Sequence, residues 1–241
     1  MPTTFSTSYC GPAPLPDDLW GRWNFDPWLI AAMLLFTAIF AFRPASRQDR
    51  LVFSAAMATL VLIFISPLCA LTVALFSARV VHHVLLVAVA APLLGSLLRR
   101  KKFGKMLAPL TGLQVAIFWL WHAPDAYQLA LTSTPIYWLM QATLLGSATA
   151  MWAAIVNATP ARAIGALLFL TMQMGLLGAL LVFSQPLYAP HFSATITFGF
   201  TPESDQQFAG LIMWVPASLP YLAIGLWLLL TLLRQPEGRS A

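Results

Sequence analysis

The stretch FSARVVHHVLLVAVAAPLLGSLL, residues 76–98, decides the fold class of this chain. After one arginine and two histidines near its start, it continues without a charged residue. Because an α-helix rises ~1.5 Å per residue, about twenty apolar residues cross the ~30 Å hydrocarbon core of a bilayer. The stretch therefore predicts a transmembrane helix that carries Arg79, His82 and His83 at one end, where ionisable groups usually mark function or internal pairing.

The composition of the whole chain is that of a membrane protein. Of its 241 residues, 59% are hydrophobic and 9% are charged, and the mean hydropathy is +0.78, whereas a soluble domain carries about 25% charged residues. The apolar runs are continuous rather than alternating, which favours helices over a β-barrel. We predict an all-α integral membrane protein with seven transmembrane helices, at residues 26–42, 51–76, 80–98, 106–122, 136–156, 163–183 and 208–233.

The basic residues predict the orientation of these helices. With the N-terminus outside, eleven of the thirteen lysines and arginines fall on the inner side, and only Arg22 and Arg79 fall outside. Lysine- and arginine-rich loops stay cytoplasmic. We therefore expect an extracytoplasmic segment at residues 1–25, a transmembrane domain at 26–233 and a cytoplasmic tail at 234–241, in a multi-pass protein of the bacterial inner (plasma) membrane. The basic loop RRKKFGK also suits anionic membrane lipids, and we expect no nucleic-acid partner.

All four histidines lie on the outer side in this topology. His82 and His83 open the third predicted helix, His122 closes the fourth, and His191 lies in the last outer loop. Imidazole is the commonest metal ligand among side chains and suits copper and zinc. The four histidines together predict a metal site, although a single histidine in a membrane bundle often only hydrogen-bonds a neighbouring helix.

Other side chains are candidates for the same site. Asp205 and Met213 are eight residues apart on the seventh predicted helix, which returns them to nearly the same face. Thioether sulfur adds a preference for Cu(I). Met172 and Met174 lie near the middle of the sixth helix, where methionine more commonly fills gaps in the packing. Asp205 has a simpler interpretation as an N-cap.

The two cysteines leave two alternatives open. Cys10 and Cys69 are both expected on the outer side of the membrane. There they form either a disulfide, which an oxidising compartment permits, or a pair of thiolate ligands. Cys69 by itself would be a small buried apolar residue.

The chain also contains three separated motifs in a fixed order, FSARVVHHVLLVAVAAPLLG, WLWHAPDAYQLAL and DQQFAGLIMW. On a seven-helix frame they resemble the multi-span CtaG-type cytochrome c oxidase assembly proteins, over roughly residues 50–233. The resemblance implies an assembly factor for a haem–copper oxidase that handles or delivers copper at the outer side of the membrane, with an oxidase subunit as its partner. Carried over position by position, it implies roles for His83, His122, Asp205, Gln206, Gly210, Met213 and Trp214.

Arg79 departs from the pattern of that family. The pattern places two histidines at i and i+4 at the head of the third helix, and here the first of them is Arg79, whose guanidinium cannot ligate a metal. Three alternatives stay open: His82 replaces the missing ligand from a neighbouring face, the metal is bound differently, or no metal is bound. Arg79 is then available to pair with Asp125 or Asp205 and to hold helices together.

These considerations give one predicted site. The expected copper ligands are His82, His83, His122, Asp205 and Met213. The accessory candidates are Cys10, Cys69, His191, Met172 and Met174. The expected structural residues are Arg79, Asp125, Gln206, Gly210 and Trp214.

Other classes of function have less support in the sequence. A retinal protein needs a lysine within a span, but Lys101, Lys102 and Lys105 all lie in the predicted inner loop. No inverted repeat supports a transporter of small solutes or metals, and no G-x-S-x-G nucleophile motif supports an enzyme, so we expect no enzymatic activity. The remaining alternative is a metal-free scaffold that binds an oxidase subunit during assembly, with histidines that serve only structural hydrogen bonds.

Overall fold

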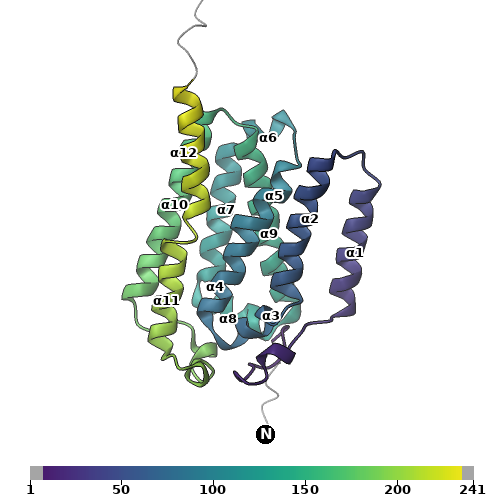
Figure 1. The fold of residues 1–241 in the computed structure, drawn as a ribbon. Coiled ribbons are helices and arrows are strands. Elements are labelled where there is room, and N and C mark those ends of the chain that lie inside the picture. The colour runs from purple at the N-terminus through teal and green to yellow at the C-terminus, as the bar shows by residue number, and fades with distance from the viewer. Residues whose placement is uncertain (1–7, 235–241) are drawn as a thin grey trace, which may run out of the picture.

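The computed structural model describes residues 8–234, and within that range it contains helices and no strand. Figure 1 shows the helices standing side by side, with α1 at one edge of the bundle and α10 to α12 at the opposite edge. The short helices α3 and α8 lie at one end of the bundle and α6 lies at the other. The predicted tail at 234–241 lies, apart from its first residue, outside the described residues.

The helices fall into three groups. Five uninterrupted helices form most of the bundle: α1 (Pro27–Ala41), α2 (Arg47–Phe64), α7 (Leu107–His122), α9 (Thr134–Val156) and α10 (Pro160–Phe183). Two further columns consist of consecutive pieces: α4 (Phe76–Val84), η2 (Leu85–Ala90) and α5 (Ala91–Ser96), then α11 (Pro202–Trp214) and α12 (Leu219–Leu233). The short helices are η1 (Leu19–Gly21), α3 (Leu68–Ala74), α6 (Lys101–Lys105), α8 (Pro124–Thr132), η3 (Ala189–His191) and η4 (Thr195–Phe198).

The lengths of the apolar helices confirm a membrane-type helical bundle. Among the described residues, four helices are long and apolar enough to cross a membrane, namely Phe76–Ser96, Thr134–Val156, Pro160–Phe183 and Pro202–Leu233. A fifth results if α2 and α3, which are bent by 45° relative to each other, count as one span. The helices α1 and α7 have only 15 and 16 residues, and they correspond to the shortest of the predicted spans, 26–42 and 106–122.

Local sequence signals fix where several helices begin. The hydroxyl of Ser46 accepts a hydrogen bond from the amide of Asp49, whose carboxylate accepts one from the amide of Ser46, so a capping box starts α2. Thr201 and Ser204 form the same arrangement before α11. Proline occupies the first turn of α1, α9, α10 and α11, where its missing N–H leaves no hydrogen bond unmade.

The column of α4, η2 and α5 is the centre of the bundle. Its middle part, η2, is a π-helical segment, a feature often found at functional sites. The indole N–H of Trp152 in α9 donates to the carbonyl oxygen of Val87 in η2 at 2.9 Å. A Cβ on Gly95 would lie 2.8 Å from the Cβ of Trp152, so α5 and α9 pack backbone to backbone. These contacts fix the helix that carries His82 and His83.

The helices α10 and α11 also meet at closely packed glycines. A Cβ on Gly210 would lie 2.6 Å from the carbonyl oxygen of Gly178, and a Cβ on Gly178 would lie 2.9 Å from that of Gly210. Small residues at such a crossing allow membrane helices to approach each other closely. The side chain of Trp214 covers the same contact, with its Cβ 3.2 Å from the Cβ position of Gly178.

We expect Gly210→Ala to destabilise the protein by about 1–3 kcal/mol, the usual cost of overpacking, because the added Cβ would meet a backbone oxygen rather than the end of a flexible side chain. A fall in the midpoint of thermal unfolding would measure this effect. Gly112→Ala is the matched control, since a Cβ there meets nothing within 4 Å and alanine is the better helix former. Equal midpoints for the two variants would show that the glycine crossing is not closely packed.

Candidate functional site

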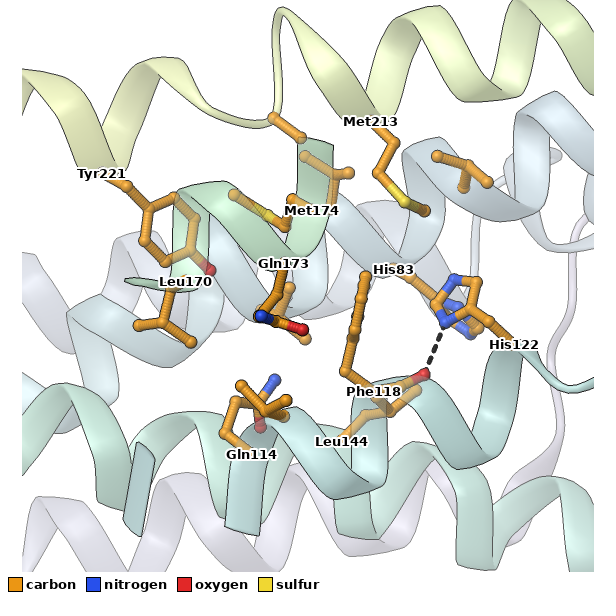
Figure 2. A pocket seen from close by; sticks show the side chains of 15 residues that line it. His83, Gln114, Phe118, His122, Leu144, Leu170, Gln173, Met174, Met213 and Tyr221 are labelled. Atoms are coloured by element: carbon orange, nitrogen blue, oxygen red, sulfur yellow. Dashed lines mark hydrogen bonds between the residues drawn. The ribbon is translucent and has the colours of Figure 1, made fainter. Parts of the chain in front are cut away.

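A pocket of about 40 Å³ lies inside the bundle, between α4, α7, α9, α10 and the α11–α12 column. Its volume suffices for a single ion or water molecule. Most of its wall is apolar, and the groups with lone pairs to offer are those of His83, Gln114, His122, Gln173, Met174, Met213 and Tyr221. We call it the histidine pocket. Figure 2 shows the two imidazoles at one end of it, with Gln114, Gln173 and Tyr221 toward the other.

His83 is the most unusual residue of the histidine pocket. Its side chain is 5% exposed, and neither of its ring nitrogens has a hydrogen-bond partner among residues 8–234. A buried polar group without a partner costs about 1–3 kcal/mol. A bound ligand at the imidazole would remove this penalty.

His122 faces His83 from the end of α7. The ring centroids of the two histidines are 6.0 Å apart, and the rings are nearly perpendicular. Nδ1 of His122 lies 2.7 Å from the carbonyl oxygen of Phe118, so this nitrogen carries the proton and donates it. The lone pair of Nε2 is therefore available, which is the arrangement that metal-ligating histidines commonly show. The hydroxyl of Tyr188 donates to the carbonyl oxygen of His122 at 2.8 Å and fixes the end of the helix.

Two thioethers complete the set of soft ligands. Met174 from α10 and Met213 from α11 both line the histidine pocket, and both are buried. Met172 does not, because its side chain is 68% exposed on the outside of the bundle. Met172 and Met174 are two positions apart, which corresponds to ~200° of rotation around a helix, so their side chains point in opposite directions.

Two glutamines that the sequence motifs do not include also line the histidine pocket. The side-chain oxygen of Gln114 accepts a hydrogen bond from Ser147 at 2.6 Å, and that of Gln173 accepts one from the indole of Trp119 at 3.0 Å. Both contacts join α7 to another helix at the wall of the histidine pocket. Amide side chains within apolar spans are a recognisable signal, and a search for them would have found both.

His82 points away from the histidine pocket. Its ring packs edge-on against Phe64 of α2, with the centroids 5.0 Å apart, and neither of its ring nitrogens has a hydrogen-bond partner among residues 8–234. Consecutive helical residues differ by ~100° in direction, so His82 and His83 face different neighbours. His82 does not line the histidine pocket, so it does not replace there the first histidine of the family pattern, whose position Arg79 occupies.

Arg79 lies one helical turn before His83, and its side chain is 0% exposed. The expected ion pair with Asp125 or Asp205 is wrong: among residues 8–234, neither carboxylate lies within ion-pair distance of the guanidinium. Instead the guanidinium carbon lies 5.4 Å from the ring centroid of Tyr137, a cation–π distance. Asp125 is exposed in the first turn of α8.

Asp205 caps the central helix rather than lining the histidine pocket. Its carboxylate accepts hydrogen bonds from the amide of Phe76 at 2.7 Å and from the amide and hydroxyl of Ser77. A carboxylate at a helix N-terminus pairs with free N–H groups and with the helix dipole. Asp205 is also the first residue of the DQQFAGLIMW motif, so this motif joins α11 to the start of α4.

Gln206 and Trp214 of the same motif are structural as well. The side-chain amide of Gln206 donates to the carbonyl oxygens of Leu181 and Gln185, and its oxygen accepts from the amide of Leu187. These bonds fasten the segment after α10 to α11. Trp214 lies over the glycine crossing and is 47% exposed.

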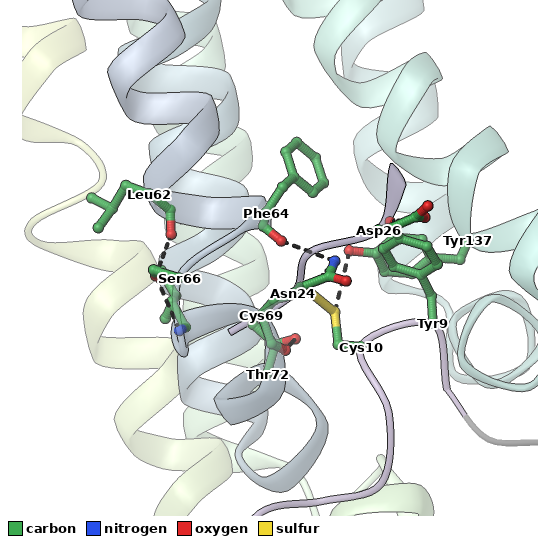
Figure 3. Close-up of a disulfide and its surroundings, with 11 residues drawn as sticks. Tyr9, Cys10, Asn24, Asp26, Leu62, Phe64, Ser66, Cys69, Thr72 and Tyr137 are labelled. Atoms are coloured by element: carbon green, nitrogen blue, oxygen red, sulfur yellow. Dashed lines mark hydrogen bonds between the residues drawn. A yellow bond between two sulfur atoms is a disulfide. The ribbon is translucent and has the colours of Figure 1, made fainter. Parts of the chain in front are cut away.

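The cysteines form a disulfide, Cys10–Cys69, so the alternative of a thiolate pair is wrong. Figure 3 shows the bond beside Asn24, whose side-chain amide donates to the carbonyl oxygen of Phe64 at 3.0 Å. The hydroxyl of Tyr9 donates to the carboxylate of Asp26 at 2.6 Å. Together these contacts hold the N-terminal segment against the end of the bundle formed by α3.

His191 is buried between helices, although a solvated loop residue would be the simpler expectation. One ring nitrogen lies 2.7 Å from the hydroxyl of Tyr127, and the other lies 3.1 Å from the carbonyl oxygen of Val73. Both nitrogens are therefore engaged, and His191 does not line the histidine pocket. Burial, helped by the charge of Arg79, lowers the pKa of His191 to about 4 from an ordinary value of 6.5.

This lowered pKa makes the stability of the protein depend on pH. In the pH range between about 4 and 6.5 the unfolded chain binds a proton at His191 and the folded chain does not, so the folded state loses stability as the pH falls. From pH 6.5 to pH 5 the loss is about 2 kcal/mol. We expect thermal unfolding at the two pH values to shift less for His191→Gln than for the parent; equal shifts would contradict this account.

Carboxylates and thiolates do not contribute to the histidine pocket. In the part of the chain that the structure describes, no group of three or more His, Cys, Asp or Glu side chains is arranged to hold a metal ion. The geometry instead offers two imidazoles with two thioethers, a donor set that suits soft Cu(I) better than hard or borderline divalent ions.

Comparison with known families supports the motif-based expectation. The model of a family described as cytochrome c oxidase caa3 assembly factor (Caa3_CtaG) matches residues 94–235, which is 142 of the 241 residues. The match includes His122, Asp205 and Met213, whereas Arg79 and His83 lie before its start. The comparisons with curated proteins and with solved structures found no match. The chain therefore belongs to the cytochrome c oxidase caa3 assembly factor family.

Proposed function

We propose that this protein holds one Cu(I) ion in the histidine pocket and passes it to a subunit of a haem–copper oxidase during assembly. Membership of the family supports a role in oxidase assembly, with the oxidase as partner and without catalysis by the protein itself. The observation that carries the copper step is His83, a buried imidazole with two unpartnered nitrogens that lines a pocket together with a second imidazole.

The potential ligands in the histidine pocket suit a copper ion that is passed on, rather than a permanently bound metal ion. His83 and His122 would supply two nitrogens, and Met213 and Met174 would supply thioether sulfur. A transfer site needs few ligands and an exchangeable position, in contrast to the closed tetrahedral cage of a structural zinc site. The ligands come from α4, α7, α10 and α11, so a small shift of one helix is enough to change the coordination.

Arg79 favours the monovalent ion. It lies four residues before His83, on the same helix face, and its buried positive charge acts on the imidazoles nearby. Repulsion between charges is strong in a medium of low dielectric constant and doubles when the charge of the ion doubles. Cu(II) would therefore be disfavoured more strongly than Cu(I). The family's histidine at this position would lack this permanent charge.

The proposed topology of the protein has seven spans in the bacterial inner membrane, with the N-terminus outside. Two observations support the orientation. The Cys10–Cys69 disulfide lies at the α3 end of the bundle, and disulfides persist in oxidising compartments such as the periplasm. The basic residues of α6 lie at the opposite end, as the positive-inside rule requires.

A deletion strain separates copper delivery from scaffolding. If the protein delivers copper, loss of the gene lowers oxidase activity and added copper restores a part of it, because excess copper bypasses a delivery step. If the protein is a metal-free scaffold, the activity falls and added copper has no effect. Oxidase activity that is unchanged by the deletion would contradict an assembly role altogether.

A further inference from the structure

A second hollow lies on the opposite side of the bundle from α10, α11 and α12. It has a volume of about 410 Å³, and it is enclosed by α1, the loop after α1, α2, α5 and α9. Its walls are mainly phenylalanine and leucine side chains, among them Phe36, Phe40, Phe53 and Leu97. We call it the α1 groove.

The α1 groove exists because α1 stands away from the bundle. Figure 1 shows α1 at the edge, beside α2. Phe40 stacks on Phe53 with the ring centroids 3.9 Å apart, and Phe36 contacts the same ring at 5.4 Å. Another apolar hollow of about 250 Å³ lies between α1, α2 and α9, and Phe36 lines both. The two apolar hollows therefore lie next to each other along α1.

The polar groups of the α1 groove lie together at the end near α6. Arg43 is exposed and makes no ion pair within the described residues. Arg99 is 68% exposed, and one of its nitrogens lies 2.9 Å from the carboxylate of Asp49. Deeper in the groove, the hydroxyl oxygen of Thr149 is buried and has no hydrogen-bond partner among residues 8–234.

We propose that the α1 groove binds one anionic phospholipid of the cytoplasmic leaflet. The phosphate lies between Arg43 and Arg99, since guanidinium groups pair closely with phosphate oxygens. The hydroxyl of Thr149 donates to an ester carbonyl of the lipid, which satisfies an otherwise unpaired buried group. One acyl chain follows the phenylalanines along α1.

The charge of the α1 groove favours an anionic lipid as its occupant. Two arginines with a single nearby carboxylate leave a positive charge at the mouth of the groove. The cytoplasmic leaflet is the one that carries the complementary anionic headgroups.

Native mass spectrometry of the purified full-length protein tests the headgroup part of this proposal. The probes are phosphatidylglycerol and phosphatidylcholine with identical acyl chains, added separately. We expect about tenfold stronger retention of phosphatidylglycerol by the parent, and loss of this preference in Arg43→Gln/Arg99→Gln. The control Lys101→Gln/Lys102→Gln removes the same charge at the same end of the bundle, outside the groove, and keeps the preference.

Thr149→Val tests the deeper contact, because it removes the hydroxyl with little change of volume. We expect several-fold weaker retention of phosphatidylglycerol by this variant, and no change for Thr37→Val, whose hydroxyl bonds the carbonyl oxygen of Met33 outside the groove. The proposal is overturned if both lipids are retained equally by the parent, or if the arginine variant and the lysine control behave alike. Thermal unfolding of each variant verifies that it is folded.

Discussion

The double variant His83→Ala/His122→Ala is expected to lose the copper that the purified parent retains under reducing conditions. Removal of even an outer-shell partner of a metal ligand costs about 10–100-fold in affinity, so removal of both imidazoles should lower the affinity by more than that. Mass-spectrometric metal analysis of protein purified with a reductant measures the copper content per chain.

The fold should survive this double substitution. Among residues 8–234, His83 makes no hydrogen bond that would be lost, and the side chain of His122 hydrogen-bonds only the carbonyl oxygen of Phe118, four residues earlier in the same helix. The size-exclusion profile and the amount of purified protein check this. A variant that is folded and retains as much copper as the parent would place the ion elsewhere, and the scaffold function would then be favoured.

A pair of methionine variants is the matched control for the thioethers. Met213 lines the histidine pocket and Met172 faces outward, and replacement of either by leucine keeps volume and apolar character. Met213→Leu should weaken copper retention, whereas Met172→Leu should leave it unchanged. If Met172→Leu lowers copper retention as much as Met213→Leu does, the loss of copper does not come from the removal of a thioether ligand in the histidine pocket.

The second large effect is expected at Asp205. Asp205→Ala should destabilise the protein by about 3 kcal/mol, because it leaves the amides of Phe76 and Ser77 buried and without their carboxylate. A lower midpoint of thermal unfolding and a lower yield of folded protein measure the loss. Asp125→Ala is the control, since Asp125 is exposed and makes no ion pair within the described residues.

The same variant distinguishes a cap from a metal ligand. If Asp205 is a cap, the fraction of Asp205→Ala that folds retains copper as the parent does. If Asp205 is a ligand, copper is lost while the stability changes little. A folded Asp205→Ala protein without copper would contradict the role that the structure gives to this carboxylate.

Much of the fold followed from the sequence because it depends on properties that the sequence displays directly. Continuous apolar runs predict helices, and the observed helices lie where the runs lie. Capping boxes and prolines mark several of the helix starts. His83 and His122 were expected at one side of the membrane, and their rings lie 6.0 Å apart in the structure.

The exact partners of side chains could not be predicted, because they depend on angles and depths that only packing fixes. Asp205 and Met213 share a helix face, but eight residues separate them by ~12 Å along the axis. One therefore reaches the start of α4 while the other reaches the histidine pocket. The choice between a disulfide and a thiolate pair likewise needed the position of Cys10, which no periodic pattern determines.

Arg79 is the residue that the sequence described least well. A buried arginine normally pairs with a carboxylate, and two carboxylates were expected nearby. The structure engages Asp205 with backbone amides instead and leaves the guanidinium against Tyr137. The positive charge of Arg79 therefore acts on the nearby imidazoles instead of being neutralised by a carboxylate.

The most direct test of the central claim is X-ray absorption spectroscopy at the copper edge on protein loaded with one equivalent of Cu(I). We predict an edge typical of Cu(I), scattering from imidazole rings and at least one sulfur neighbour, with the imidazole contribution lost in His83→Ala/His122→Ala. A copper ion surrounded by oxygen only, or a spectrum that the double substitution leaves unchanged, would contradict the account.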